Sequence, residues 1–125
     1  LMLYIDASAA VKLLRSESES AALFTFIQSE RICSSALMTL ELSRWAHRQP
    51  TDHLAVHQLT ECFDLIDIAA AQMRVAATFQ TQHLGTLDAI HLATALLIDA
   101  DALVTYDKQL AEAATAAGLR VVSPA

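Results

Sequence analysis

The sequence has few residues of the kinds that break or cross-link a chain. It contains two glycines, two prolines and two cysteines in 125 residues. Cys33 and Cys62 lack the Cys-x-x-Cys spacing of many zinc and redox sites, so we interpret them as reduced core thiols without a role. A Gly-x-Ser-x-Gly motif is absent, and neither cysteine belongs to a known nucleophile signature. The sequence therefore indicates no covalent nucleophile.

Long apolar runs are also missing. Hydrophobic residues make up 54% of the chain and the mean hydropathy is +0.38, yet charged or hydroxyl residues interrupt every apolar stretch before the roughly 18 residues that a membrane span needs. The N-terminal LMLYID enters a strand pattern directly, without the basic region or cleavage site of a secretory signal. We therefore expect a cytoplasmic protein without membrane contact, and we attribute the apolar excess to a core and a partner surface.

Positive charge is scarce. Eight Lys and Arg residues stand against fourteen Asp and Glu, which gives a net charge of −6. This balance excludes a general nucleic-acid coat protein, because sequence-independent binding depends on cationic contacts to phosphate. It does not exclude a nuclease, because the local field around a pocket matters more than the sum.

The order of the predicted elements indicates an α/β fold. The length suits a single domain, residues 1–125, because domains most often have about 100 to 150 residues. Apolar runs and helical periodicity predict strands at 1–5, 31–34, 65–68, 102–105 and 120–122, and helices at 8–14, 17–28, 36–47, from Pro50 onward, 70–83, 86–98 and 108–117. Gly85 is expected to end one helix in a left-handed conformation, with Thr86 capping the next. This alternation predicts a three-layer α/β/α arrangement around a parallel sheet of about five short strands, with a helical hairpin after residue 36.

Four acidic residues each follow an apolar strand or lie on an apolar helix. They are Asp6, Glu41, Asp88 and Asp107. Ligands of open parallel sheets bind at the carboxyl ends of the strands, where Asp6 and Asp107 fall. Two like charges about 4 Å apart repel by roughly 4 kcal/mol at an effective dielectric near 20, so converging acids imply a hard divalent cation, Mg²⁺ or Mn²⁺. The reaction that fits such a site is hydrolysis of a phosphodiester by metal-activated water.

The residues at the strand ends also have purely structural interpretations. Ser8 could orient Asp6 or a metal-bound water, and it could equally cap the helix that follows. Asp107 could cap its own helix, although an extended backbone would direct it toward the same side as Thr105.

The helical residues have structural interpretations as well. Glu41 could be a solvated glutamate on a helix face. Asp88 could serve only to stabilise the first turn of its helix, which is worth about 0.3 to 1 kcal/mol. His91, one turn after Asp88, is interpreted as a hydrogen-bonded core residue.

The segments YIDASAAVKLL, LELSRW, TLDAIHLATAL and LVTYDKQLAEAA, followed by GLRVV, resemble the PIN-domain nucleases. The resemblance spans the whole chain, and it is strongest to the VapC toxins of bacterial toxin-antitoxin pairs, which are single PIN domains of about this length. It implies a PIN-like fold in which the four acids are catalytic metal ligands. Ser8 and Thr105 would complete the catalytic set, and the cations that could contact substrate would be Lys12, Arg15, Arg44 and Lys108.

The same resemblance implies a function. We expect a Mg²⁺-dependent endoribonuclease that is the toxin of a type II toxin-antitoxin system and cuts single-stranded or looped RNA to leave a 5′-phosphate. The implied partners are a cognate VapB-type antitoxin, which would cover an apolar groove and occupy the acidic pocket, and a second copy of the chain in a homodimer.

Two alternatives come from other classes of protein. The first is a phosphoacceptor receiver-like signalling domain, which shares the length, the parallel sheet and the acidic cluster. Its pattern fits poorly, because receivers pair adjacent acids after the first strand, whereas Ala7 follows Asp6 here. The second is a catalytically inactive PIN-like binding module, which the presence of all four acids disfavours.

Overall fold

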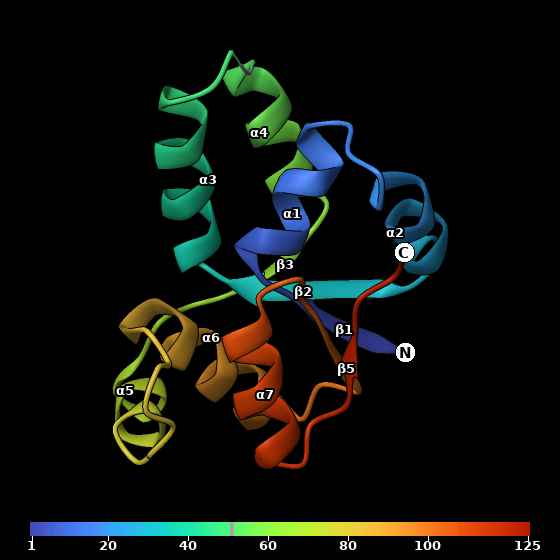
Figure 1. Ribbon diagram of the computed structural model, residues 1–125. Helices are drawn as coiled ribbons and strands as arrows, with labels where there is room; N and C mark the ends of the chain where they lie inside the picture. The colour runs from blue at the N-terminus through green and yellow to red at the C-terminus, as the bar shows by residue number, and fades with distance from the viewer. Residues whose placement is uncertain (51) are drawn as a thin grey trace.

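A parallel sheet forms the centre of the protein (Figure 1). The computed structural model describes residues 1–50 and 52–125, and within them the sheet has five strands. These are β1 (Met2–Ile5), β2 (Arg31–Ser35), β3 (Asp64–Ile66), β4 (Ala102–Val104) and β5 (Val121–Val122). Their spatial order is β3-β2-β1-β4-β5, and all neighbouring pairs are parallel. The predicted α/β fold with a short-stranded parallel sheet is confirmed.

Helices cover both faces of this sheet, as predicted (Figure 1). They are α1 (Ala7–Leu14), α2 (Ser20–Ile27), α3 (Leu37–His47), α4 (His53–Glu61), α5 (Ala70–Ala76), α6 (Thr86–Leu97) and α7 (Lys108–Ala116). The first four lie on one side and the last three on the other, and α3 packs against α4 as the expected hairpin. None of the helices in the described ranges is both long and apolar enough to cross a membrane.

The alternation of side chains along β1 divides the core in two. Leu3 and Ile5 are fully buried in the cluster formed with α1 to α4, whereas Tyr4 is fully buried in the cluster formed with α6 and α7. Successive strand side chains point to opposite faces, so a continuous apolar run is what a sheet covered on both sides requires.

The strand order places a reversal of chain direction beside β1. From β1 the chain moves outward to β2 and β3, and then returns to add β4 on the other side of β1. Ligand sites of open α/β sheets lie at the carboxyl ends of the strands at such a reversal, which is where Asp6 and Thr105 follow their strands. Receiver domains have the order 2-1-3-4-5, so the receiver interpretation is wrong.

Several predicted helix ends differ from the observed ones. Gly85 has φ −67°, so it is not left-handed, and it is the N-cap of α6, in which Thr86 is the first residue. The preceding helix, α5, ends at Ala76 instead of residue 83. Shortly after it, the Thr78 hydroxyl donates to the Val75 carbonyl at 2.7 Å, and such a local bond competes with helical continuation.

One further helix starts later than predicted. The carboxylate of Asp52 accepts from the Leu54 amide at 2.8 Å, so α4 begins at His53 and not near Pro50. Gly118, by contrast, follows α7 with φ +85° and stops that helix as expected.

Cys62 is exposed, so the interpretation of both cysteines as core thiols is wrong for this one.

Candidate active site

Asp6 lies where β1 ends, and its carboxylate caps α1. It is 2% exposed. Its Oδ1 accepts from the Ala9 amide at 3.1 Å, and its Oδ2 accepts from the Thr105 hydroxyl at 2.7 Å. Burial raises the pKa of Asp6, while hydrogen bonds from Thr105, Ser8 and Ala9 oppose that rise. The N-cap position therefore buries a carboxylate at the reversal of the sheet and fixes its orientation.

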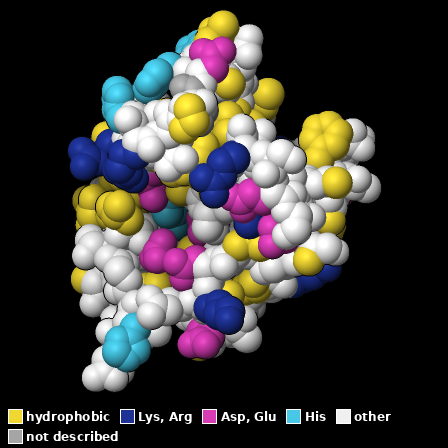
Figure 2. Space-filling view, turned by 45° about the horizontal axis from the view of Figure 1, so that its top comes forward, with side chains coloured by type: hydrophobic (Ala, Val, Ile, Leu, Met, Phe, Trp, Pro, Cys, Tyr) yellow, Lys and Arg dark blue, Asp and Glu magenta, His cyan; other side chains and the backbone are white. Residues whose placement is uncertain are grey.

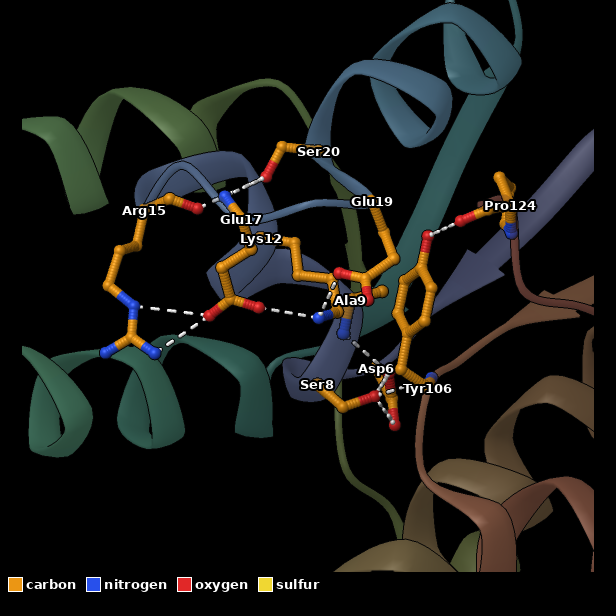
Figure 3. A network of polar contacts seen from close by, with 10 residues as sticks. All are labelled: Asp6, Ser8, Ala9, Lys12, Arg15, Glu17, Glu19, Ser20, Tyr106 and Pro124. Carbon is orange, nitrogen blue, oxygen red and sulfur yellow. Dashed lines mark hydrogen bonds and ion pairs between the residues drawn. The ribbon is translucent and has the colours of Figure 1, made fainter.

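Ser8 holds Asp6 and does not cap the helix itself. Its hydroxyl donates to Asp6 Oδ1 at 2.7 Å and accepts from the Tyr106 amide at 2.9 Å (Figure 3). On the neighbouring strand end, the Thr105 hydroxyl accepts from the Asp107 amide at 3.1 Å. Ser8 and Thr105 thus connect the ends of β1 and β4. Of the two interpretations of Ser8, the geometry supports the one in which its hydroxyl orients Asp6.

Asp88 is in the first turn of α6, and its pKa lies above the ordinary value. Burial, together with nearby negative charges, raises the pKa of Asp88 to about 6. The negative charges of Asp107, Asp6 and Glu41 each add to this rise, while His91 opposes it. Such effects require nearby charges, which indicates that Asp88 lies near each of the other three acids.

The other two acids are held in different ways. Asp107 is the N-cap of α7, and its Oδ1 accepts from the Leu110 amide at 3.0 Å. Glu41 lies mid-helix on α3, with a side chain only 17% exposed, and its Oε1 is 2.5 Å from Nε2 of His91. Glu41 is therefore not a solvated residue on a helix face.

His91 is fully buried and hydrogen-bonded, as predicted. Its Nδ1 is 2.7 Å from the Tyr4 hydroxyl. Sequence reasoning missed its contact with Glu41, because that contact joins two helices 50 positions apart. The only available signal was the spacing of one helical turn from Asp88 to His91.

The donor set suits a hard divalent cation. The converging groups are carboxylates, and their mutual repulsion is what a cation relieves. In the parts of the chain that the structure describes, no three His, Cys, Asp or Glu side chains form a ready-made coordination site. Mg²⁺ commonly retains several waters and takes only one or two protein carboxylates directly. Carboxylates that are near one another but do not form a complete coordination shell therefore suit that ion.

A hollow of about 390 Å³ opens beside Glu41. Its lining includes Ser8 and Glu41 together with Arg44, Trp45, Arg48 and Leu87. Figure 2 shows acidic side chains gathered on this side of the molecule, with Lys and Arg side chains around them. An aromatic ring and two guanidinium groups next to an acidic centre are suited to bind a nucleotide, and Trp45 was not among the predicted site residues.

The remaining predicted cations differ in their surroundings. Lys12 Nζ contacts Glu17 at 2.6 Å and Glu19 at 2.9 Å, and lies 4.8 Å from the centre of the Tyr106 ring (Figure 3). Arg15 also pairs with Glu17, at 2.9 Å. Lys12 and Arg15 thus bind acids of their own chain, whereas Lys108 is exposed immediately after Asp107.

Comparison with known proteins gives the family. The family model described as PIN domain matches residues 3–116. The chain is 41% identical over 131 residues to Ribonuclease VapC35 of Mycobacterium tuberculosis, covering 98% of this chain and 97% of that protein.

Solved structures have the same fold. VapBC2 from Rickettsia felis, bound to a DNA fragment from its promoter, has a TM-score of 0.77 at 12% identity and full coverage of both chains. Mycobacterium tuberculosis VapC20, described as a Sarcin-Ricin loop cleaving toxin, has a TM-score of 0.77 at 15% identity, covering 98% of this chain and 99% of that one. With a family match over most of its length and a relative at 41% identity, the chain belongs to the PIN-domain family, among the VapC ribonucleases.

Proposed function

We propose that this chain, as a single PIN domain, is a Mg²⁺- or Mn²⁺-dependent endoribonuclease that acts in the cytoplasm as the toxin of a type II toxin-antitoxin system. The observation that carries the proposal is the gathering of acids at the reversal of the sheet. Asp6 and Asp107 are N-caps of the helices that follow β1 and β4, and Asp88 lies near enough for their charges to raise its pKa. A phosphodiesterase site of this kind needs a divalent cation.

The chain's own residues would divide the work as follows. Asp6, Glu41, Asp88 and Asp107 would hold the cation, which when bound supplies Lewis acidity toward the phosphate and the attacking water. The hydroxyls of Ser8 and Thr105 keep the Asp6 carboxylate in place. Arg44, Arg48 and Lys108 would bind the phosphate backbone on either side of the scissile bond, and Lys12 and Arg15 would join them after exchanging their internal carboxylate partners.

RNA is the substrate class that these features favour. The relative at 41% identity is named a ribonuclease. In the hollow beside Glu41, Trp45 offers a ring on which an unpaired base can stack, with Arg44 and Arg48 close by. Stacking and backbone contacts of this kind suit single-stranded or looped RNA, whose bases are accessible.

A VapB-type antitoxin is the proposed partner. Leu87 lines the hollow and is 47% exposed, and Leu40, next to Glu41 on α3, is 56% exposed. An apolar segment of a partner covering these side chains would exclude RNA from the acids. We also infer a homodimer, for which other exposed apolar side chains, such as Phe24 and Leu54, offer contact area.

Cleavage of defined RNAs tests the activity. Purified protein should cut single-stranded and hairpin RNA in Mg²⁺ or Mn²⁺, stop in EDTA, and leave 5′-phosphate ends on sequencing. Asp88→Asn should abolish cutting, while the matched change at an exposed acid, Asp67→Asn, should not. Wild-type protein that binds RNA but never cuts it would instead support the inactive binding module.

The partner is tested separately. The product of an open reading frame next to the gene should co-purify with this chain as a stable complex and block RNA cleavage. Light scattering of the free toxin should give twice the mass of one chain, and a monomer would contradict the homodimer.

A further inference from the structure

A row of buried hydrogen bonds runs from the sheet to the acid cluster. Tyr4 on β1 and His91 on α6 are both fully buried. The Tyr4 hydroxyl lies 2.7 Å from His91 Nδ1, and His91 Nε2 lies 2.5 Å from Glu41 Oε1. The Tyr4 and His91 rings also pack edge to face, with centroids 5.7 Å apart. β1, α6 and α3, which are distant in sequence, are thereby connected through hydrogen bonds that end at Glu41.

The contact between His91 and Glu41 has a defined direction, because an ionised carboxylate can only accept a hydrogen bond. Burial raises the pKa of Tyr4, so the phenol keeps its proton and can donate it to Nδ1. Nε2 then carries the imidazole proton and donates to the Glu41 carboxylate. The opposite tautomer would place the lone pair of Nε2 against that carboxylate and lose the contact.

Glu41 needs such a partner more than the two acids that cap helices do. Asp6 and Asp107 are N-caps and accept from backbone amides at 3.1 and 3.0 Å. Glu41 is in the middle of α3, where backbone amides are already used within the helix. A mid-helix glutamate also has several rotatable bonds, whose freedom must be lost to fix the carboxylate.

We propose that His91, oriented by Tyr4, is a positioning residue that holds the Glu41 carboxylate toward the divalent cation of the proposed ribonuclease site. The inference rests on the proposed function. The contact uses Oε1, and Glu41 also lines the hollow beside the acids. Imidazole groups and carboxylates that orient metal ligands in this way commonly change metal affinity 10- to 100-fold when removed.

Two amide substitutions separate this role from simple packing. In His91→Gln the side-chain amide nitrogen can occupy the place of Nε2 and still donate to Glu41. In His91→Asn the shorter amide reaches only the place of Nδ1, beside Tyr4. We expect Mn²⁺ titration calorimetry to give a dissociation constant about 10- to 100-fold weaker for His91→Asn, and within about threefold of wild type for His91→Gln.

Controls keep the result interpretable. His57→Gln changes an exposed histidine on α4 and should leave Mn²⁺ affinity unchanged. Tyr4→Phe removes only the hydroxyl and should weaken Mn²⁺ binding less than His91→Asn does. Circular dichroism of each metal-free variant establishes that it is folded before titration.

A measurement without metal tests the same geometry. In the nitrogen-15 spectrum of metal-free wild-type protein, Nε2 of His91 should carry a proton. A proton on Nδ1 alone, which leaves Nε2 without a hydrogen to donate, would overturn the inference even if the variants fail to fold.

The outcomes distinguish the two proposals. If wild-type protein does not bind Mn²⁺, the proposed function fails. If wild type binds and both amide variants bind equally well, or both weaken equally, the metal site stands and the positioning role of His91 is overturned.

Discussion

Replacing Asp88 by asparagine should stabilise the metal-free protein. The pKa of this carboxyl rises from its ordinary 3.8 to about 6 because of burial and the charges of Asp107, Asp6 and Glu41. In the described part of the chain its carboxylate accepts no hydrogen bond from another residue, so an amide of the same shape loses no such bond. The substitution therefore removes mainly an unfavourable charge.

The size of the effect follows from the pKa. A rise from 3.8 to about 6 corresponds to a cost of about 3 kcal/mol for the ionised form at pH 8. Asp88 is partly open to solvent, which screens the repulsion, and its charge at the N-terminal turn of α6 is worth about 0.3 to 1 kcal/mol in the favourable direction. We expect a net gain of about 1 to 2 kcal/mol, or about 3 to 8 °C in melting temperature for a chain of this length.

The pH dependence provides the control. A raised pKa means that the folded state binds a proton more tightly than the unfolded state, so the cost is fully present above pH 6 and vanishes below about pH 4. Urea unfolding in EDTA should show the gain of Asp88→Asn at pH 8 and little difference from wild type near pH 4. A variant less stable than wild type at pH 8, or a difference independent of pH, would refute the repulsion argument.

Three further predictions follow from the same site. Mg²⁺ at saturating concentration should raise the melting temperature of the wild type, because a ligand that binds only the folded state stabilises it, and scanning calorimetry should find a smaller rise in Asp88→Asn. Ser8→Ala removes a donor to Asp6 and should lower the free energy of unfolding by about 1 to 3 kcal/mol, measured in urea; an unchanged value would mean that the hydroxyl is not needed there. Arg44→Ala, in an Asp88→Asn background that cannot cut, should weaken single-stranded RNA binding and reduce the slope of log affinity against log salt by about 0.7, measured by fluorescence anisotropy, whereas Arg120→Ala at an exposed position near β5 should leave that slope unaltered.

The strand-end acids could be predicted because their positions depend on local pattern. An apolar run followed by Asp, and then by helical periodicity, marks both the end of a parallel strand and an N-cap, as at Asp6 and Asp107. An N-cap and a metal ligand would both occupy this position, so the sequence could not decide between the structural and the functional interpretation of Asp6 and Asp107. The cap brings the carboxylate to the carboxyl edge of the sheet.

Other features depend on packing between distant segments and left no local signal. The contact of Glu41 with His91 exists because α3 and α6 meet at the edge of the sheet, and a pattern of apolar residues does not specify which helices meet. The pairing of Lys12 with Glu17 and Glu19 likewise depends on how the chain turns between α1 and α2.

Gly85 was assigned to the wrong helix end because glycine occurs at both ends of helices, and only its φ of −67° distinguishes the two positions.

The way in which each acid is held indicates which half of the site needs the cation. Asp6 and Asp107 are anchored by backbone amides of the helices that they cap, so their positions are maintained by the fold itself. Asp88 lies near like charges, and among the described residues the hydrogen-bond partner of the Glu41 carboxylate is an imidazole on another helix. We therefore expect loss of the cation to change the Asp88 and Glu41 side, through the start of α6 and the middle of α3, and to leave the ends of β1 and β4 as they are. Hydrogen exchange with and without Mg²⁺ should show this asymmetry, because protection reports local stability element by element, and equal protection changes at all four acids would contradict it.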